Sequence, residues 1–516
     1  MPAGRRWPAA ADLLFALALG ALHSLAFVHP LAWSLQMAMV ALLVWRVQGA
    51  DSWRAAGLGI AFGTAWFGAG TWWLYISMHH YGGLPAWLTV LAITLLSAFL
   101  ALYLALGMAV FARWRSGCGC GWRDALLFAA VWLLAELARG VIFTGFPWVA
   151  SGYAHVDGPL AALAPWVGAY GIGFIGAALA AWPVLAQPPR SRAVAMLGVV
   201  AVLAAAPLVG PGRFTQPSST LRVALLQGNV AQDEKFAVEL MPKALGWARE
   251  QLLAADADLV LAPETVIPLL PSQLDPGYWQ ELLQHFRQPG RAALIGLPLG
   301  DEAHGYTNSA AGLAAATAGA PGGFYRYDKH HLVPFGEFIP TGFRWFTELM
   351  NIPLGDFNRG PVSAPSFVVK GERIAANICY EDLFGEELAA RFTSSAEAPT
   401  IFANISNIGW FGDTIAVHQH LQISRMRTLE FQRPMLRATN TGATVVIDHA
   451  GRVTASLAPF TQGVLNATVQ GRTGLTPFAQ WAQRFGLWPL LLLAAVIVTA
   501  CAFVPRPHAA RPRPVR

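Results

Sequence analysis

The chain has 516 residues, of which 55% are hydrophobic and only 12% are charged, and its formal net charge is +6. Soluble globular chains have roughly 25% charged residues, so this composition excludes a wholly soluble enzyme. It also excludes a disordered or fibrous chain, which needs more charge to stay solvated. The excess of positive charge comes mostly from arginines at the ends of apolar runs, not from a basic stripe interleaved with aromatic residues. We therefore expect a membrane protein that does not bind nucleic acid.

Apolar runs long enough to cross a membrane occur in two parts of the chain. The hydrocarbon core, about 30 Å thick, takes roughly 20 helical residues. Arg5 and Arg6 precede the first run, as in a signal peptide, but no small-residue cleavage site with a polar mature start follows, so a retained helix is predicted. About eight spans are predicted: Pro8–Phe27, Leu31–Val47, Ala55–Met78, Leu84–Ala112, Ala125–Val141, Leu160–Leu185, Ala193–Val209 and Leu487–Val504.

The short connections between these runs differ in arginine content, which predicts their orientation. Basic residues are retained on the cytoplasmic side of a membrane. Arginines gather in alternate connections and in the C-terminal tail, so both termini are predicted to be cytoplasmic and the long segment after the seventh span to lie outside the cytoplasm. The predicted domains are a transmembrane domain at 1–216, an extracytoplasmic domain at 217–480, and a last helix with a basic cytoplasmic tail at 481–516.

The segment 217–480 has the pattern of a soluble α/β domain, because short strand-like runs alternate with polar, helix-forming stretches. Several of the strands are apolar without alternation, which is typical of a sheet covered on both faces. The predicted strands are Leu221–Leu226, Leu259–Ala262, Ala292–Leu297, Ala310–Leu313, Phe367–Val369, Ile374–Ile378, Thr400–Ile405 and Thr444–Ile447, and the predicted helices are Glu234–Ala255, Gly277–Phe286, Glu386–Phe392 and His418–Glu430.

Cys379 is the only one of the four cysteines that falls within 217–480, so it has no disulfide partner there. A lone cysteine is either a buried inert thiol or a reactive one. Cys379 ends the apolar strand Ile374–Ile378, at a corner where backbone N–H groups point toward whatever the sulfur attacks, and this favours the reactive interpretation. The pair Cys118 and Cys120 has no further Cys or His cluster beside it, so no metal site is predicted.

Two further residues could serve acyl transfer by Cys379. Glu264 follows the strand Leu259–Ala262, and Lys329 is one of only four lysines in a chain with 31 arginines. In such a set the carboxylate accepts the thiol proton, the thiolate attacks a carbonyl, and the ammonium and the N–H of Tyr380 stabilise the oxyanion. A purely structural ion pair between Glu264 and Lys329 is the alternative.

Three strings carry a resemblance to a known family. Ala262-Pro-Glu264-Thr, Tyr327-Asp-Lys329-His-His-Leu-Val-Pro-Phe-Gly-Glu337 and Asn377-Ile-Cys379-Tyr-Glu381 resemble the Glu–Lys–Cys segments of the nitrilase superfamily. With seven spans before them and one after, the chain resembles the apolipoprotein N-acyltransferase family of Gram-negative bacteria over almost its whole length. Further matching strings are Gln227-Gly-Asn229, Thr144-Gly-Phe-Pro-Trp148, Trp410-Phe-Gly-Asp413, His418-Gln-His-Leu-Gln422, Arg433-Pro434 and Arg437-Ala-Thr-Asn440; one departure is Ile408, where that resemblance leads us to expect Asp.

The resemblance implies an αββα nitrilase-like domain in the periplasm, attached to a multi-pass protein of the bacterial inner membrane. It implies transfer of an acyl chain from a phospholipid, through a thioester on Cys379, to the amine of a diacylglyceryl-cysteine in an apolipoprotein. By the same resemblance Glu264 is the base, Lys329 the oxyanion stabiliser and Cys379 the nucleophile, with Glu337 and Glu381 in support. No cofactor is expected, and a monomer is expected.

The resemblance also implies substrate or activity roles for Trp410 and Arg139, although Arg139 lies one helical turn from Glu136 and the two could simply neutralise one another. The apolar segment 339–353 follows Glu337 and contains Trp345 and Phe346. It is predicted to be a membrane-dipping flap that admits lipid, and a helix packed on the domain's own core is the alternative.

Two other functions fit the pattern less well. A membrane-tethered amidase acting on small amides would use the same three residues but would not need eight spans. A transporter or sensor would need the spans but not the Glu–Lys–Cys set, and it would carry ionisable residues at the membrane midplane.

Overall fold

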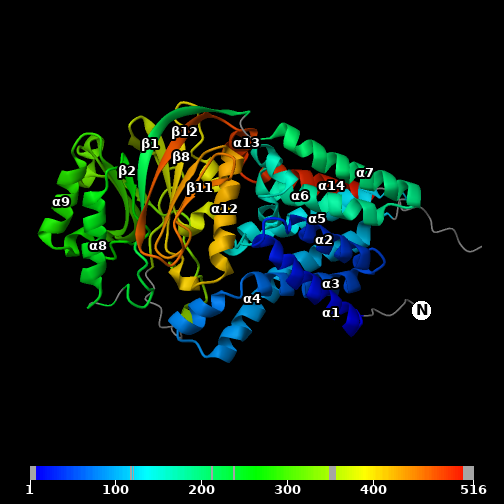
Figure 1. The fold of residues 1–516 in the computed structure, drawn as a ribbon. Coiled ribbons are helices and arrows are strands. Elements are labelled where there is room, and N and C mark those ends of the chain that lie inside the picture. Colours follow the sequence, from blue (N-terminus) through cyan, green and yellow to red (C-terminus); the bar gives the residue numbers. More distant parts are fainter. Residues whose placement is uncertain are drawn as a thin grey trace, which may run out of the picture.

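The computed structural model describes residues 7–116, 119, 121–210, 213–235, 237, 239–347 and 356–503. The described residues form two parts that lie side by side (Figure 1). One is a helical bundle built from the N-terminal 210 residues and the last helix, and the other is a two-sheet domain that holds most of the remaining chain.

Every predicted span contains a helix of the bundle. Among the described residues, five helical stretches are long and apolar enough to cross a membrane, and the pair α13 (Pro477–Phe485) and α14 (Trp488–Phe503), bent by 86°, could form a sixth. The other bundle helices are α1 (Ala10–Ser24), α2 (Trp33–Val47), α3 (Ser52–Gly70), α4 (Ala86–Trp114), α5 (Trp122–Val141), α6 (Ala164–Leu185) and α7 (Pro189–Ala205).

The predicted count of eight spans exceeds these five or six because two helices fall short, one in length and one in hydropathy. Helix α2 has only 15 residues, fewer than a perpendicular span needs. Helix α3 has 19 residues, but Arg54 and its glycines make it less apolar than the other spans. The run predicted at Ala55–Met78 is also interrupted, because α3 ends at Gly70 and a separate π-helix, η2 (Ile76–Tyr81), follows it. The count of eight therefore stays a prediction.

The outer surface of the bundle is apolar. On α4, Leu91, Leu95, Leu102 and Leu106 are exposed, and α7 is exposed along most of its length. A contiguous apolar surface of this kind would be unfavourable in water, whereas lipid tails accommodate it without cost. The bundle is therefore suited to a membrane.

The two-sheet domain contains two six-stranded sheets that face each other. One has the order β12-β1-β2-β3-β4-β5 and the other β11-β10-β9-β8-β7-β6, and three central strands of each sheet run parallel. The strands are β1 (Thr215–Gln227), β2 (Leu259–Leu261), β3 (Ala292–Asp301), β4 (Gly305–Ala314), β5 (Tyr325–Asp328), β6 (Phe367–Val369), β7 (Glu372–Ile378), β8 (Ile401–Ser406), β9 (Met435–Thr439), β10 (Val445–Ile447), β11 (Val453–Ser456) and β12 (Gly463–Gly474).

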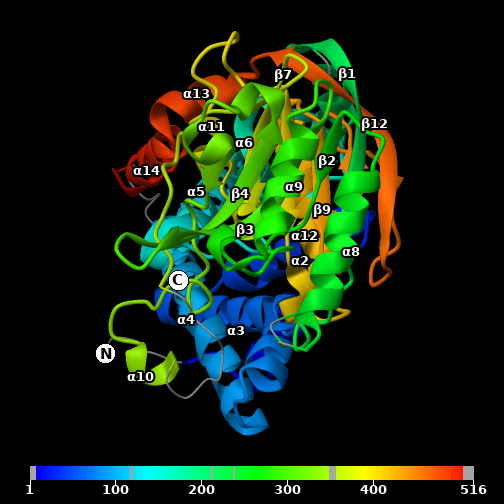
Figure 2. The ribbon, with the colours of Figure 1, turned by 90° about the vertical axis from the view of Figure 1, so that its left-hand side faces the viewer.

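Helices cover the outer faces of both sheets. Helices α8 (Met241–Ala254) and α9 (Pro276–Phe286) pack on the first sheet and stand in front of it in Figure 2. Helix α12 (Ile415–Phe431) lies between the second sheet and the bundle (Figure 1). Between the sheets, apolar side chains such as Leu261 and Ile405 form one shared core. These strands are buried on both faces, which explains their unbroken apolar sequences.

The strand and helix predictions for this domain hold in most places. All eight predicted strands and all four predicted helices correspond to elements of the structure, whereas β5, β9, β11 and β12 were not predicted. The predicted helix at Glu234–Ala255 starts too early, because α8 begins at Met241 and Gln232–Lys235 form a turn. That turn reaches the site described next.

Candidate active site

The three residues of the predicted Glu–Lys–Cys set follow strands of different sheets. Glu264 lies three residues after β2, Lys329 directly follows β5, and Cys379 directly follows β7. Because the two sheets pack face to face, their strand ends bring the side chains of Glu264 and Lys329 to the corner that carries Cys379. The carboxylate of Glu381 accepts from the backbone N–H groups of His330 and Ile378, the neighbours of Lys329 and Cys379, and so brings the lysine and cysteine segments into one site.

Lys329 lies between two carboxylates. Its Nζ is 3.3 Å from Glu264 Oε1 and 2.9 Å from Glu337 Oε1, and the side chain is 1% exposed. Burial alone would lower the pKa of Lys329, but the charges of Glu264 and Glu337 outweigh it and raise that pKa above its usual value. The lysine is therefore a fixed ammonium, and Glu337, predicted to be supporting, is in direct contact with it.

Glu264 is held by two groups besides Lys329. Asn308 Nδ2 donates to Oε1 at 2.7 Å, and the backbone N–H of Asn407 donates to Oε2 at 2.8 Å. Burial raises the pKa of Glu264, but Lys329 and Asn308 more than offset this and leave it below its usual value. Asn308 also donates to Glu337 Oε1 at 2.6 Å, so one amide orients both carboxylates. Glu264 is therefore an ionised carboxylate of fixed orientation.

Cys379 occupies a strained corner. Its φ is +54°, in the left-handed region that non-glycine residues rarely adopt, and it begins the short helix η10 (Cys379–Leu383). Unlike its neighbours Ile378 and Tyr380, which are buried, Cys379 is partly exposed. Burial and then Glu264 raise the pKa of its thiol to about 12, against the opposing effect of Lys329. The resting sulfur is thus a thiol, which needs a base to react.

A buried polar network holds the backbone of this corner. Asn404 Nδ2 and His420 Nε2 each lie 3.2 Å from the carbonyl oxygen of Cys379. His420 Nε2 is also 2.9 Å from Asp382 Oδ1, and Arg437 donates to His420 Nδ1 at 2.7 Å. Because Nδ1 accepts, Nε2 must carry the proton and donate. His420, from the string His418–Gln422, therefore braces the backbone of Cys379.

Glu381 connects the lysine segment to the cysteine corner. Its Oε2 accepts from Tyr327 Oη at 2.7 Å and from the N–H of Ile378 at 2.6 Å, and its Oε1 accepts from the N–H groups of His330 and His331. Burial raises its pKa. Glu381 thus lies behind the site, where it fixes the chain on both sides of Lys329 and Cys379.

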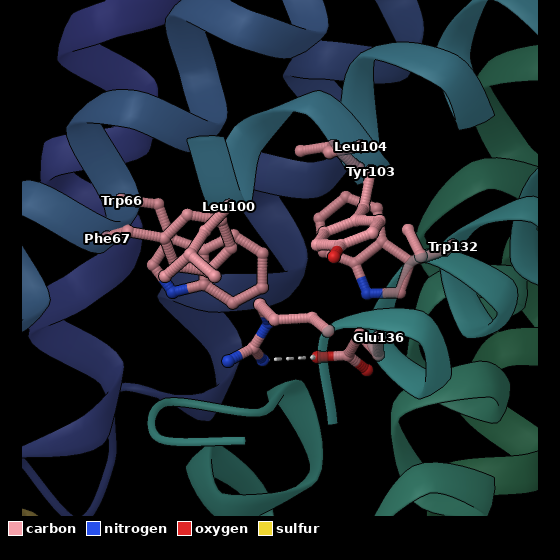
Figure 3. A pocket seen from close by; sticks show the side chains of 9 residues that line it. Trp66, Phe67, Leu100, Tyr103, Leu104, Trp132 and Glu136 are labelled. Atoms are coloured by element: carbon pink, nitrogen blue, oxygen red, sulfur yellow. Dashed lines mark ion pairs between the residues drawn. The ribbon is translucent and has the colours of Figure 1, made fainter. Parts of the chain in front are cut away.

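Tyr380 points its side chain at the bundle. Its hydroxyl donates to the carbonyl oxygen of Gly145 at 3.1 Å. The loop that carries Gly145 is held in turn by Arg139, whose guanidinium donates to the carbonyls of Phe146 and Trp148. Arg139 is 2% exposed and 3.7 Å from Glu136 Oε1 (Figure 3). Arg139 thus pairs with Glu136 and braces a loop next to the site, and its substrate or activity role stays a prediction.

Arg139 and Glu136 line the cavity drawn in Figure 3, among the side chains of Trp66, Tyr103 and Trp132. Its volume is about 10 Å³, near what a single water needs. Arg139 therefore contacts protein groups and not a lipid-sized pocket in this structure.

The structure also describes part of the remaining predicted residues. Trp410, in η11 (Ile408–Phe411), is partly exposed, and its ring meets Tyr81 of the bundle edge-on at 5.7 Å. Trp345 is 61% exposed in the short helix α10 (Arg344–Thr347). The side chain of Phe346 and residues 348–353 of the predicted flap lie outside the described residues. Ile408, where the resemblance led us to expect Asp, is buried.

Three polar residues of the site were not predicted. Asn308 and Asn407 hold Glu264, and Lys235 Nζ donates to the backbone oxygen of Glu264 at 3.1 Å. Asn308 lies in β4 just before the predicted run Ala310–Leu313, so no apolar pattern singled it out. Within the described part of the chain, no group of His, Cys, Asp or Glu residues has the arrangement of a metal site.

Comparisons with known proteins agree with this architecture. Residues 19–182 match the family described as the apolipoprotein N-acyltransferase N-terminal domain, and residues 222–478 match the carbon-nitrogen hydrolase family. An amidase from Nesterenkonia sp. AN1 is 18% identical, with a TM-score of 0.35 over 52% of this chain and 98% of that chain. A score that low adds nothing to the family assignment.

Relatives that span the whole molecule carry the assignment. The apolipoprotein N-acyltransferase of Verminephrobacter eiseniae is 53% identical, over 88% of this chain and 89% of the relative. The apolipoprotein N-acyltransferase of Ralstonia nicotianae is 48% identical, over 93% of this chain and 92% of the relative. Identity at this level along both the helical bundle and the two-sheet domain means that the chain belongs to the apolipoprotein N-acyltransferase family.

Proposed function

We propose that this protein transfers a fatty acyl chain from a phospholipid, through a thioester on Cys379, to the N-terminal amine of a diacylglyceryl-cysteine in an apolipoprotein. The observation that carries the proposal is the buried cluster of Glu264, Lys329 and Glu337 at the corner of a partly exposed cysteine that forms no disulfide within the described residues. The apolar bundle attached to this cluster and the names of the relatives support a lipid acyl donor and a lipoprotein acceptor.

In the first half-reaction Glu264 takes the proton from the Cys379 thiol, and the sulfur attacks the carbonyl carbon of the phospholipid ester. Lys329 Nζ and the N–H of Tyr380 stabilise the oxyanion. As the tetrahedral intermediate collapses, the ester C–O bond breaks and Glu264 returns its proton to the leaving oxygen. The products are a lysophospholipid alcohol and an acyl thioester on Cys379.

In the second half-reaction the acceptor amine attacks the thioester carbonyl. A C–N bond forms, the C–S bond breaks, and Glu264 moves the proton lost by nitrogen to the departing sulfur, which restores the thiol. Because the thiol pKa of about 12 lies far above neutral pH, protonation of the departing sulfur is strongly favoured. Charge in the site is then the same before and after turnover.

The peripheral residues receive roles that fit their positions. Arg139 holds the loop against Tyr380, and Trp410 borders the site next to the bundle. Trp345, with Phe346, dips into the lipid surface and admits acyl chains. The exposed indole of Trp345 supports this, because a helix packed on the domain core would bury it.

Placement in the cell follows from the arginine distribution. The proposed arrangement is a monomer with eight spans in the bacterial inner membrane, domain limits at 216 and 480, and the αββα domain in the periplasm. A reporter active only outside the cytoplasm should be active when fused after Arg213 and inactive when fused after Arg192. The reverse pair of results would contradict this orientation.

The acceptor distinguishes this function from that of a membrane-tethered amidase. Purified protein in phospholipid-containing detergent should acylate a diacylglyceryl peptide with a free N-terminal amine, as read by mass spectrometry. The matched control is the same peptide with an acetylated amine, which should gain no chain. Hydrolysis of small amides without any transfer to the free amine would favour the amidase instead.

A further inference from the structure

Lys235 is a second lysine that reaches the site from the first sheet. It ends the turn Gln232–Lys235, is 5% exposed, and comes from a segment far in sequence from Lys329. Its Nζ donates to the backbone oxygen of Glu264 at 3.1 Å and to Thr265 Oγ1 at 2.6 Å. Neither acceptor is charged. Among the described residues no carboxylate lies within ion-pair distance of this ammonium, which is unusual for a buried lysine.

The other lysines outside the triad behave as surface residues. Lys243 is exposed on α8, and Lys370 is 49% exposed with Asp258 Oδ1 at 2.6 Å. A buried ammonium without a carboxylate partner costs desolvation energy that hydrogen bonds to neutral oxygens only partly offset. Such unfavourable burial is most often found where a site needs the charge.

The site near Cys379 needs a further positive charge, because its carboxylates outnumber its ammonium groups. Two carboxylates, Glu264 and Glu337, face one ammonium, Lys329, in a buried environment. Negative charge in excess disfavours the thiolate of Cys379, and Glu264 is the largest charged contributor to the high pKa of that thiol. The ammonium of Lys235 adds a second positive charge, so that two ammonium groups balance the two carboxylates.

The two hydrogen bonds of Lys235 also restrain the base. Thr265 has a φ of +46°, so the turn that carries Glu264 is itself in the left-handed region. Lys235 contacts this turn on both sides of the peptide bond between Glu264 and Thr265. A local alternative conformation of the turn would break both bonds.

We propose that Lys235 is a positioning residue of the acyl-transfer site, which clamps the turn carrying Glu264 and offsets the excess carboxylate charge facing Cys379. The proposal rests on the proposed function for its effect on acyl transfer, but its effect on the thiol does not depend on any acyl donor. The charged groups that face Lys235 are Glu264 and Cys379, and Lys329 and Glu337 lie behind Glu264.

The charge on Lys235 is sensitive to mildly alkaline pH. Burial lowers the pKa of Lys235 to about 8, although Glu264 and Cys379 act in the opposite direction. The ammonium is thus present below about pH 8 and is lost above it. Its contribution to thiol reactivity should follow the same course.

The test measures alkylation of Cys379 by iodoacetamide as a function of pH in the detergent-purified full chain. Lys235→Met removes charge and hydrogen bonds, whereas Lys235→Gln keeps N–H donors without the charge. Both should slow alkylation at pH 7.5 by about tenfold and move the pH profile upward, because a lost neighbouring cation raises the thiol pKa. Lys243→Met is the matched control and should match the wild type.

The outcomes separate the possibilities. If both Lys235 variants are alkylated within twofold of the wild-type rate and keep the wild-type pH profile, the proposal is overturned. A wild-type pH profile in Lys235→Gln alone would overturn its electrostatic part. If Lys235→Met does not fold, Lys235→Gln carries the test, and Lys235→Arg should recover the wild-type profile. Because iodoacetamide is no acyl donor, a wild-type protein that alkylates normally but never accepts an acyl chain would count against the proposed function and not against Lys235.

Discussion

The two halves of the candidate site are held in different ways. The half with Glu264 and Lys329 is held within the two-sheet domain, by Asn308, Asn407 and Glu337. The half with Cys379 is also held by the bundle. Tyr380 donates to Gly145, and Tyr153 donates to the carbonyl of Leu383, so both ends of η10 contact bundle residues.

Helix α12 strengthens this difference. His420 faces the carbonyl of Cys379, while the adjacent Gln419 accepts from the indoles of Trp73 and Trp148 and donates to the carbonyl of Gly70. One helix therefore contacts both the Cys379 corner and the bundle. Under the proposed mechanism the half with Glu264 and Lys329 is the base half, and the half with Cys379 is the nucleophile corner. The comparison teaches that the base half is held within the two-sheet domain, whereas the nucleophile corner is also held by the bundle.

The largest effect is expected from Lys329→Met, which breaks the base half. It leaves Glu264 and Glu337 as buried carboxylates without their cation, a change that costs about 3–5 kcal/mol in comparable pairs. Acyl-enzyme should not form, and the thermal unfolding midpoint should fall. Lys370→Met removes a half-exposed pair with Asp258 and should cost no more than about 1 kcal/mol. Equal effects of the two variants would contradict the account.

Glu264→Gln should come next, because it keeps an acceptor for Asn308 but removes the base. Acylation should slow by about 10²–10⁴-fold. The pH dependence should change as well. In the wild type Glu264 stays ionised throughout the neutral range, because Lys329 and Asn308 hold its pKa below the usual value despite the raising effect of burial. The wild-type rate should be nearly flat between about pH 6 and 7.5.

In Glu264→Gln only the thiolate fraction reacts. Since the wild-type thiol pKa is about 12, that fraction rises about tenfold with each pH unit in the neutral range. The acylation rate of Glu264→Gln can be measured at several pH values by quenching the reaction after fixed times and determining the intact mass, which gives the change in rate per pH unit. A flat profile in the variant would mean that another group is the base.

Gln419→Leu tests the dependence of the nucleophile corner on the bundle. It leaves the indole N–H of Trp148 buried without its acceptor, which costs about 1–3 kcal/mol for such a group, and leaves the indole of Trp73 with only the carbonyl of Gly70. We expect a lower unfolding midpoint and several-fold slower alkylation of Cys379. His418→Ala, one residue before Gln419 on the same helix and exposed, is the control and should change stability by about 0.5 kcal/mol or less. Unchanged alkylation in Gln419→Leu would contradict the proposed dependence of the Cys379 corner on the bundle.

The smallest effect is expected at the lipid surface. Replacing Trp345 and Phe346 with Ser should reduce turnover of long-chain phospholipid a few-fold, because the segment would lose apolar side chains that hold it at the lipid surface. Alkylation of Cys379 should stay at the wild-type rate. Val453→Ser, at an exposed apolar position on β11, is the control. Loss of turnover and alkylation together would place this segment in the core.

Residues that follow apolar strands were predictable from the sequence. Glu264 and Cys379 each come directly after a buried strand run, and the charged string from Lys329 to Glu337 is conspicuous in a lysine-poor chain. Their partners were not predictable, because Asn308, Asn407 and Lys235 become neighbours of Glu264 only when the sheets pack. Local pattern carries no information on such long-range contacts.

The missed strands have similar physical causes. β9 contains Arg437, which is fully buried in the network under Cys379, and a charged residue interrupts the apolar run that marks a strand. β12 is half exposed and is held by its antiparallel pairing with β1 along most of its length. Neither feature appears as an apolar run. In the bundle, the break between α3 and η2 was hidden for the opposite reason, since apolar residues continue across it.

The central claim is a covalent acyl-enzyme on Cys379, and intact-mass analysis after incubation with phospholipid and no acceptor tests it most directly. The account predicts that the wild type gains the mass of one acyl chain, that neutral hydroxylamine removes it as expected of a thioester, and that Cys379→Ala gains nothing. Cys379→Ser should at most form a slow, hydroxylamine-resistant ester. An acyl adduct that persists in Cys379→Ala, or a wild type that never gains acyl mass in any phospholipid, would contradict the account.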